Sequence, residues 1–300
     1  MRPTIILVHG AYHSPSHFDK LASCLHRAGY EVEAVDLPSV GIEQDPGDAL
    51  RRDTKAVLLA IEKLTNEDKN VVVFMHSYGG VVSLPVFYQE NRNKKEEEED
   101  PNSPRLHLPP LTRPHPKCGS EASASFLSHQ PPTSQPDRPH GTITRLIYLN
   151  AEILPQGQSW METHTLAQDP LLANLPINLN QETNTLTFLE PLKYFYTPTT
   201  SPLEAEIATS TLQPMAMSAF TQKAECDAYG TWAAHRVPVS YVGCKQDALL
   251  PWGMQQEYVA RLRDSGVSVS STWLDYDHSP FVSQAEEVAQ LIEVAIDKSE

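Results

Sequence analysis

The segment VVVFMHSYGG at residues 71–80 places the strongest constraint on what this chain can fold into. Its β-branched start is typical of a buried strand, and the glycines after Ser77 permit a sharp turn into a helix. Such a unit lifts a serine Oγ clear of the sheet, so Ser77 is a candidate nucleophile. Met75 stands where the G-x-S-x-G pattern has its first glycine. A strand-turn-helix with an ordinary surface serine is the alternative interpretation.

A second glycine-containing loop follows an expected strand near the N-terminus. Residues 4–8 have the pattern of a short buried strand, and they continue into His9-Gly10-Ala11-Tyr12-His13. Glycine lets the backbone turn so that its N–H groups point outward. We therefore expect the backbone N–H groups of Ala11 and Tyr78 to form an oxyanion hole, which stabilises negative charge on a substrate carbonyl oxygen.

A serine nucleophile needs a base, and the base needs an acid that orients it. The expected strand at 237–244 leads to Asp247, and the expected strand at 267–274 leads to His278, which an amphipathic helix follows. We predict a triad of Ser77, Asp247 and His278, each in a loop after a strand. His76, next to the serine, is expected to pack or to form hydrogen bonds, because its side chain should point away from Oγ.

This order of nucleophile, acid and base is that of the α/β-hydrolases, which the chain resembles. It is similar to their cofactor-free branch of plant methylesterases and hydroxynitrile lyases, and to microbial and fungal hydrolases with an HSYGG elbow. The resemblance implies the same triad and oxyanion residues. The sequence departs from the family pattern at two positions: Met75 replaces the first glycine of the elbow, and Asp277 stands where a glycine commonly precedes the histidine. The motifs that carry it are LVHGAYH at 7–13, VDLPSVG at 35–41, MHSYGG at 75–80, YVGCKQDALLP at 241–251 and DHSPFVSQAEEVA at 277–289.

Three functions are compatible with these motifs. The favoured one is hydrolysis of a small, largely apolar ester or lactone through an acyl-enzyme. The second is a lyase or carbon–carbon bond-cleaving enzyme on the same scaffold. Against it, the lyase relatives carry a lysine after the histidine and a threonine in the HG loop, where this chain has Ser279 and Gly10. The third is a ligand-sensing protein with slow turnover.

The charge of the chain limits its partners. It has 38 acidic and 23 basic residues, a formal charge of −15, which disfavours nucleic acid and anionic membranes. We expect a small-molecule substrate, neutral or cationic, and a monomer or homodimer. No span of apolar residues suits a membrane helix and no signal peptide is evident, so we expect a cytoplasmic protein. The sequence has no dinucleotide or phosphate-binding glycine motif, so we expect no cofactor.

A metal site is a weaker possibility. His9, His13 and His17 recur at helical spacing, but Gly10 and Pro15 indicate a loop instead, so we expect no metal ion. His13 should instead contact substrate or organise the turn. The cysteines lack paired spacing and are expected to be free thiols: Cys24, Cys118, Cys226 and Cys244.

Strands that alternate with helical patterns predict an α/β fold with a mostly parallel sheet and helices on both faces. We expect one hydrolase domain from residues 1–90 and 143–300, with a helical cap at 152–235. The cap should supply substrate contacts, and we predict that Trp160 joins Tyr12 and His13 there. Its aromatic residues could line an apolar pocket or form the core of the cap. These are Trp160, Phe188, Tyr194, Phe195, Tyr196, Phe220, Tyr229 and Trp232.

Residues 91–142 differ in kind from the rest of the chain. They begin with KKEEEED, are rich in proline and serine, and carry few large apolar residues. Such a segment cannot bury enough surface to offset the entropy of ordering, so we expect a disordered insertion. A partner-docking segment and an intron read as coding sequence are the alternatives.

Deleting residues 93–140 and joining the ends with a short glycine-serine linker should leave activity nearly unchanged. The melting temperature should change by about 3 °C or less, because a charge-rich and proline-rich segment contributes little burial. Thermal unfolding and ester turnover of the deleted and full-length chains test this. A larger fall in melting temperature would show that the segment packs against the domain.

Overall fold

The computed structural model describes residues 2–82, 141–166 and 175–297 of the chain. Contacts between Cα atoms divide the chain into one unit of residues 1–88 and 140–300 and a second unit of residues 89–139. The expected insertion at 91–142, which includes Cys118, lies outside the described residues except for its last two.

The larger unit is built on a six-stranded sheet in the order β2-β1-β3-β4-β8-β9, with every neighbouring pair parallel. β1 and β3 are buried along their whole length, which explains why both read as unbroken apolar runs. The strands that the sequence predicts at 4–8, 32–35, 143–149, 237–244 and 267–274, and the one that leads to Ser77, are all present. They are β1 Thr4–Val8, β2 Val32–Val35, β3 Val71–His76, β4 Ile143–Leu149, β8 Val239–Cys244 and β9 Val269–Leu274.

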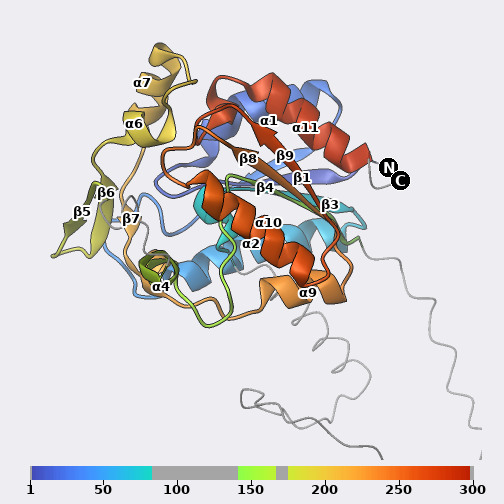
Figure 1. Ribbon diagram of the computed structural model, residues 1–300, viewed down its shortest axis with the longest axis horizontal. Coiled ribbons are helices and arrows are strands. Elements are labelled where there is room, and N and C mark those ends of the chain that lie inside the picture. The colour runs from blue at the N-terminus through green and yellow to red at the C-terminus, as the bar shows by residue number, and fades with distance from the viewer. Residues whose placement is uncertain (1, 83–140, 167–174, 298–300) are drawn as a thin grey trace, which may run out of the picture. The chain divides into compact units, whose positions relative to one another are not determined.

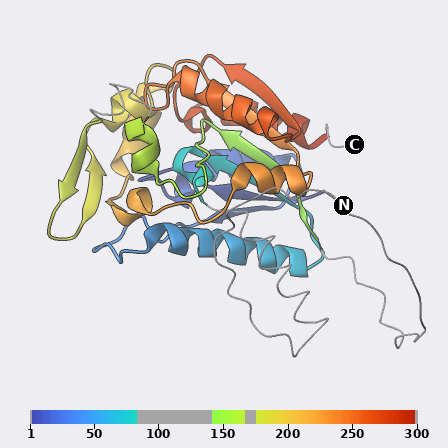
Figure 2. The same ribbon diagram turned by 60° about the horizontal axis from the view of Figure 1, so that its bottom comes forward.

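Helices cover both faces of the sheet. α1 (Asp19–Arg27) and α11 (Ala285–Asp297) lie side by side on one face, while α2 (Ala49–Asn66) and α10 (Trp252–Asp264) lie on the other (Figures 1 and 2). The sequence spacing explains the packing of α2, which buries Leu50, Val57, Ile61 and Leu64 along one stripe. Three short 3₁₀ turns complete this framework: η1 Pro15–Phe18, η2 Ser77–Gly80 and η3 Pro280–Val282.

The cap between β4 and β8 is helical, as the sequence predicts, but it also holds a small antiparallel sheet in the order β5-β6-β7. Its hairpin turns at Asn184, which has a left-handed φ of 54°. The small sheet, α6 and α7 lie at the left of Figure 1 with α4 below them, whereas α9 lies apart from them below α10. The elements are α4 Trp160–Leu166, β5 Ile177–Asn180, β6 Thr185–Phe188, α6 Pro191–Phe195, α7 Pro202–Ser210, β7 Met215–Ala216, α8 Ser218–Thr221 and α9 Ala228–Ala234.

The architecture confirms the predicted fold class, an α/β fold with a parallel sheet between helices and a cap. No described helix combines the length and apolar character that crossing a membrane requires. Cys24 and Cys244 are free thiols.

Asp53 is a buried carboxyl that ties α2 to the turn after β3. Its Oδ1 accepts the backbone N–H of Ser39 at 2.9 Å, and its Oδ2 accepts the hydroxyl of Tyr78 at 2.7 Å. Burial raises the pKa of Asp53 to about 6, although both hydrogen bonds act in the opposite direction. The folded protein therefore holds this proton more tightly than the unfolded chain, whose aspartates titrate near 4.

Raising the pH from 4 to 7 should destabilise the wild type relative to Asp53→Asn by up to about 3 kcal/mol. A raised folded-state pKa contributes stability at low pH, and this contribution is lost as pH rises through the folded value near 6. Urea unfolding of both proteins across this pH range measures the difference. Asp264→Asn, which changes an exposed aspartate on α10, is the matched control. A difference that stays flat with pH would contradict the prediction.

Candidate active site

Ser77 stands at a strained turn directly after β3. Its φ of 52° lies in the left-handed region, which non-glycine residues rarely adopt. The neighbouring glycines let the chain pack closely around it. A Cβ on Gly79 would lie 2.7 Å from the carbonyl oxygen of Val8, and one on Gly80 would collide with the carbonyl oxygen of Glu152. The turn thus has the form of the nucleophile elbow that the sequence predicts, while Met75 is fully buried within β3.

The loop after β1 packs against this elbow. A Cβ on Gly10 would lie 2.8 Å from Nδ1 of His76 and 2.9 Å from Cβ of Ser77, so only glycine fits there. Tyr12 takes a left-handed φ of 65°, which turns the loop. The close contact at Gly10 brings Ala11 beside the serine.

His278 and Asp247 form a buried pair. His278 Nδ1 lies 2.7 Å from Asp247 Oδ2, and both side chains are almost fully buried. A carboxylate only accepts, so Nδ1 carries the proton and Nε2 is left as the basic nitrogen. The second oxygen of Asp247 accepts the backbone N–H groups of Leu249 and Leu250, each at 2.8 Å. This carboxylate is therefore fixed on both sides.

Asp277 adjoins the histidine but points elsewhere. Its Oδ2 accepts the backbone N–H groups of Thr199 at 3.0 Å and Thr200 at 2.7 Å, while Oδ1 accepts that of Ser279 at 3.2 Å. The backbone N–H of Asp277 in turn donates to Thr199 Oγ1. Asp277 therefore anchors the cap loop to the base loop, which leaves Asp247 as the carboxylate at the imidazole.

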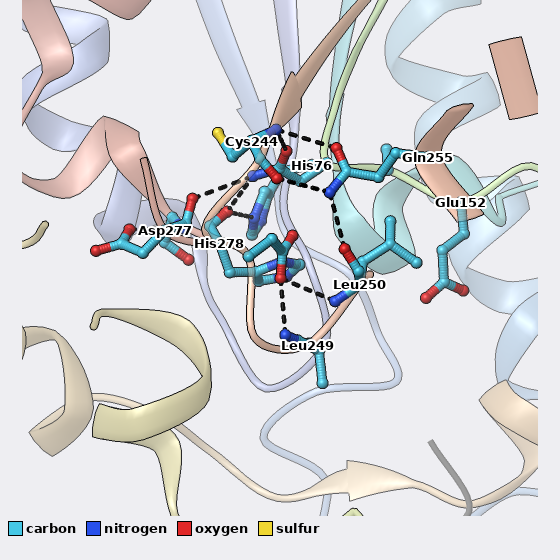
Figure 3. Close-up of polar contacts among 12 residues, drawn as sticks. His76, Glu152, Cys244, Leu249, Leu250, Gln255, Asp277 and His278 are labelled. Atoms are coloured by element: carbon cyan, nitrogen blue, oxygen red, sulfur yellow. Dashed lines mark hydrogen bonds and ion pairs between the residues drawn. The ribbon is translucent and has the colours of Figure 1, made fainter. Parts of the chain in front are cut away.

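A polar network holds the backbone around His278 (Figure 3). The His278 carbonyl accepts His76 Nε2 at 3.0 Å and Asn150 Nδ2 at 2.9 Å. Gln255 spans the neighbouring loop, donating to the carbonyls of Cys244 and Leu250 and accepting the N–H of Cys244. His76 thus forms a structural hydrogen bond, in keeping with its expected role.

The predicted site residues converge on one cavity beneath the cap. Ser77 and His278 line it together with Ala11, Tyr78, Tyr12, His13 and Trp160. Four of the expected cap aromatics also face it: Trp160, Phe188, Phe195 and Phe220. The other four, Tyr194, Tyr196, Tyr229 and Trp232, are buried in the core. The remaining walls of the cavity are formed by Glu152, Leu175, Ile177 and Leu249.

The three spaced histidines have separate protein partners. His9 donates Nδ1–H to the Gly10 carbonyl and accepts the Leu37 N–H on Nε2. His13 contacts the Ala11 carbonyl at 2.7 Å and the Tyr196 hydroxyl at 2.9 Å, so both ring nitrogens are used. Among the described residues, no group of histidine, cysteine or acidic side chains has a metal-binding arrangement.

Burial keeps these rings neutral. It lowers the pKa of His9 to about 4, and it holds the pKa of His13 and His76 well below the ordinary value, with neighbouring histidines adding to the effect. The His76 and His278 rings pack in a tilted arrangement, with their centroids 4.8 Å apart. The cluster therefore packs beside the base without adding positive charge near it at neutral pH.

Sequence reasoning missed several residues of this site. Asn150 and Glu152 follow β4, at the sheet edge from which the other loops also emerge. Their position after an expected strand could therefore have identified them as site residues. Gln255 lies within α10, and Asp53 lies within α2. Nothing in the local sequence distinguishes these two from ordinary helix residues.

Comparison with known sequences places the chain in context. A profile of the alpha/beta hydrolase family matches residues 5–291. The alpha/beta hydrolase nvfD of Aspergillus novofumigatus is 29% identical over 161 residues, which is 53% of this chain and 47% of that protein. Methylesterase 7 of Arabidopsis thaliana is 33% identical over 79 residues, 25% of this chain and 30% of that protein. The chain thus spans less than half the length of either curated relative.

Solved structures show the same fold at low identity. Polyneuridine aldehyde esterase has a TM-score of 0.63 and 18% identity, covering 98% of this chain and 100% of that one. The methylesterase protein MES16 from Arabidopsis has a TM-score of 0.62 and 18% identity, covering 99% of both chains. With a family match that covers nearly the whole sequence, the resemblance drawn from the motifs is confirmed: the chain belongs to the alpha/beta hydrolase family.

Proposed function

We propose that this protein is a serine hydrolase that cleaves a small, largely apolar ester or lactone through an acyl-enzyme. The observation that carries the proposal is the buried His278–Asp247 pair, 2.7 Å long, whose histidine shares a cavity with Ser77. The fold is common to many chemistries, so the argument rests on this site. The names of the esterase relatives support the same reaction class.

In the first half-reaction, His278 Nε2 takes the proton of Ser77 as Oγ attacks the substrate carbonyl carbon. The backbone N–H groups of Ala11 and Tyr78 stabilise the resulting oxyanion. Asp247 keeps the imidazole oriented and stabilises its positive charge. When the ester bond breaks, the imidazolium returns its proton to the leaving alcohol, and the acyl group stays on Ser77.

In the second half-reaction, His278 takes a proton from water, which attacks the acyl carbon. The tetrahedral intermediate collapses, Ser77 Oγ recovers the proton, and the carboxylic acid leaves. A lactone follows the same steps, except that its alcohol stays attached to the acyl group. No cofactor enters any of these steps.

The walls of the cavity support an apolar substrate. Trp160, Phe188, Phe195 and Phe220 meet over the serine, and aromatic faces favour apolar groups. The cavity volume is about 30 Å³, space for very few water molecules. Binding an ester therefore requires the cap side chains to move apart, and the cap controls which esters are accepted.

A fluorophosphonate probe should label Ser77 covalently, because the probe reacts with an activated serine hydroxyl. Peptide mass spectrometry identifies the labelled residue. The matched control is Ser279→Ala, which removes the serine next to the base and should still be labelled. Labelling that persists in Ser77→Ala would refute the assignment of the nucleophile.

Asp247→Asn should lower kcat/KM on a p-nitrophenyl ester by about 10⁴, because the imidazole loses its orienting acceptor. Asp277→Asn should have a far smaller effect on turnover. It should instead lower the stability by about 1–3 kcal/mol, because the amide cannot accept all the backbone donors that now meet the carboxylate.

Steady-state kinetics and urea unfolding of both variants provide the comparison. Each variant removes one buried negative charge beside His278, so each is the matched control of the other. A larger loss of kcat/KM in Asp277→Asn would transfer the role of the acid to Asp277.

A further inference from the structure

Glu152 introduces a carboxylate into a cavity with largely aromatic and aliphatic walls. It follows β4 by three residues, is only 5% exposed, and lines the cavity together with Ser77 and His278. Its backbone N–H donates to the Ser77 carbonyl at 3.3 Å, so it is attached directly to the elbow. A group held by this side chain would therefore belong to a molecule positioned at the serine.

This carboxylate is incompletely partnered. Its Oε1 lies 3.4 Å from Nε2 of His164, which stacks on Trp160 at 3.8 Å. Its Oε2 is buried and forms no hydrogen bond with any residue in the described part of the chain. Figure 3 shows Glu152 to the side of the hydrogen-bonded network around His278. A buried carboxylate oxygen without a donor is costly, so such oxygens are normally paired.

A second buried polar group near Glu152 does not supply the missing hydrogen-bond donor. The hydroxyl of Tyr258, on α10, is also buried and unpartnered among the described residues. Burial, and after it the negative charge of Glu152, holds the pKa of this phenol well above its usual value. Tyr258 is not part of the cavity wall, whereas Glu152 is. The free acceptor capacity of Glu152 is therefore available to a ligand in the cavity.

We propose that Glu152 is a recognition site for a substrate ammonium group, so that the natural ester carries a basic amine close to its apolar part. The proposal rests on the hydrolase function above and specifies its substrate class. Glu152 would accept an N–H from the ammonium, while the Ser77 end of the cavity holds the ester carbonyl.

Three features favour a cation over a neutral donor such as a hydroxyl. A charged donor forms the stronger hydrogen bond with a carboxylate. Trp160 and Phe220 present aromatic rings in the same cavity, with centroids 4.9 Å apart, and aromatic faces attract cations. The chain carries a formal charge of −15, which raises the local concentration of cations around the protein.

The test is direct binding of two probes without an ester bond, phenylpropylammonium and its neutral analogue phenylpropanol. Isothermal titration calorimetry of the full chain at neutral pH should show the ammonium binding about tenfold tighter or more. Glu152→Gln should abolish this preference. The matched control, Glu206→Gln, removes an exposed glutamate on α7 and should retain the preference, because only the long-range charge changes.

Equal affinity of the wild type for the two probes would overturn the proposal, and so would tighter binding of the alcohol. A preference that persists in Glu152→Gln would overturn it as well. If Glu152→Gln fails to fold, the comparison of the two probes in the wild type still decides the matter. Because neither probe can be hydrolysed, the result does not depend on whether Ser77 is a nucleophile, which the fluorophosphonate experiment tests separately.

Discussion

The left-handed backbone at Ser77 is the constraint on which the site depends. A non-glycine residue with a φ of 52° costs on the order of 1–2 kcal/mol, and the surrounding packing must maintain it. Gly10, Gly79 and Gly80 make this possible, because a Cβ at any of them would collide with the neighbouring chain. The same close packing joins the ends of β1 and β3 to the segment after β4. The strained backbone at Ser77 is therefore maintained by the close packing of these segments.

Parallel strands explain why five separate segments meet at this point. In a parallel sheet the carboxyl ends of all strands lie at one edge, so the loops after β1, β3, β4, β8 and β9 converge there. When such a loop is buried, its backbone N–H and C=O groups need hydrogen-bond partners. Asn150 and Asp277 supply such partners between separate segments of the chain, and Gln255 joins α10 to the loop after β8. His278 is thus positioned by hydrogen bonds beyond the one it forms with Asp247.

Much of this architecture could be predicted from the sequence, for a physical reason. Strands buried on both faces require apolar runs, and β1, β3 and β8 carry them, whereas the runs predicted for β2 and β9 are only partly buried. The positions of Ser77, Asp247 and His278 then follow from where those runs end. The cap hairpin at 177–188 was missed, because its Asn and Thr residues give only a weak alternation and Leu179 is 40% exposed. The partners of Gln255 and Asp53 depend on tertiary contacts, which a local pattern does not contain.

Asp247 and Glu152, two buried carboxylates that follow neighbouring strands, differ in how far the protein satisfies them. Asp247 accepts the imidazole and two backbone N–H groups, so its acceptor capacity is committed within the protein. Glu152 lies at the end of a neighbouring strand with similar burial, yet one of its oxygens has no donor among the described residues. Burial of a carboxylate is costly, and the hydrogen bonds to Asp247 compensate for it on both oxygens, whereas Glu152 has only the 3.4 Å contact of Oε1 with His164. The remaining compensation for Glu152 has to come from the contents of the cavity, which is why an apolar wall with one such carboxylate favours a ligand that is apolar but carries a donor.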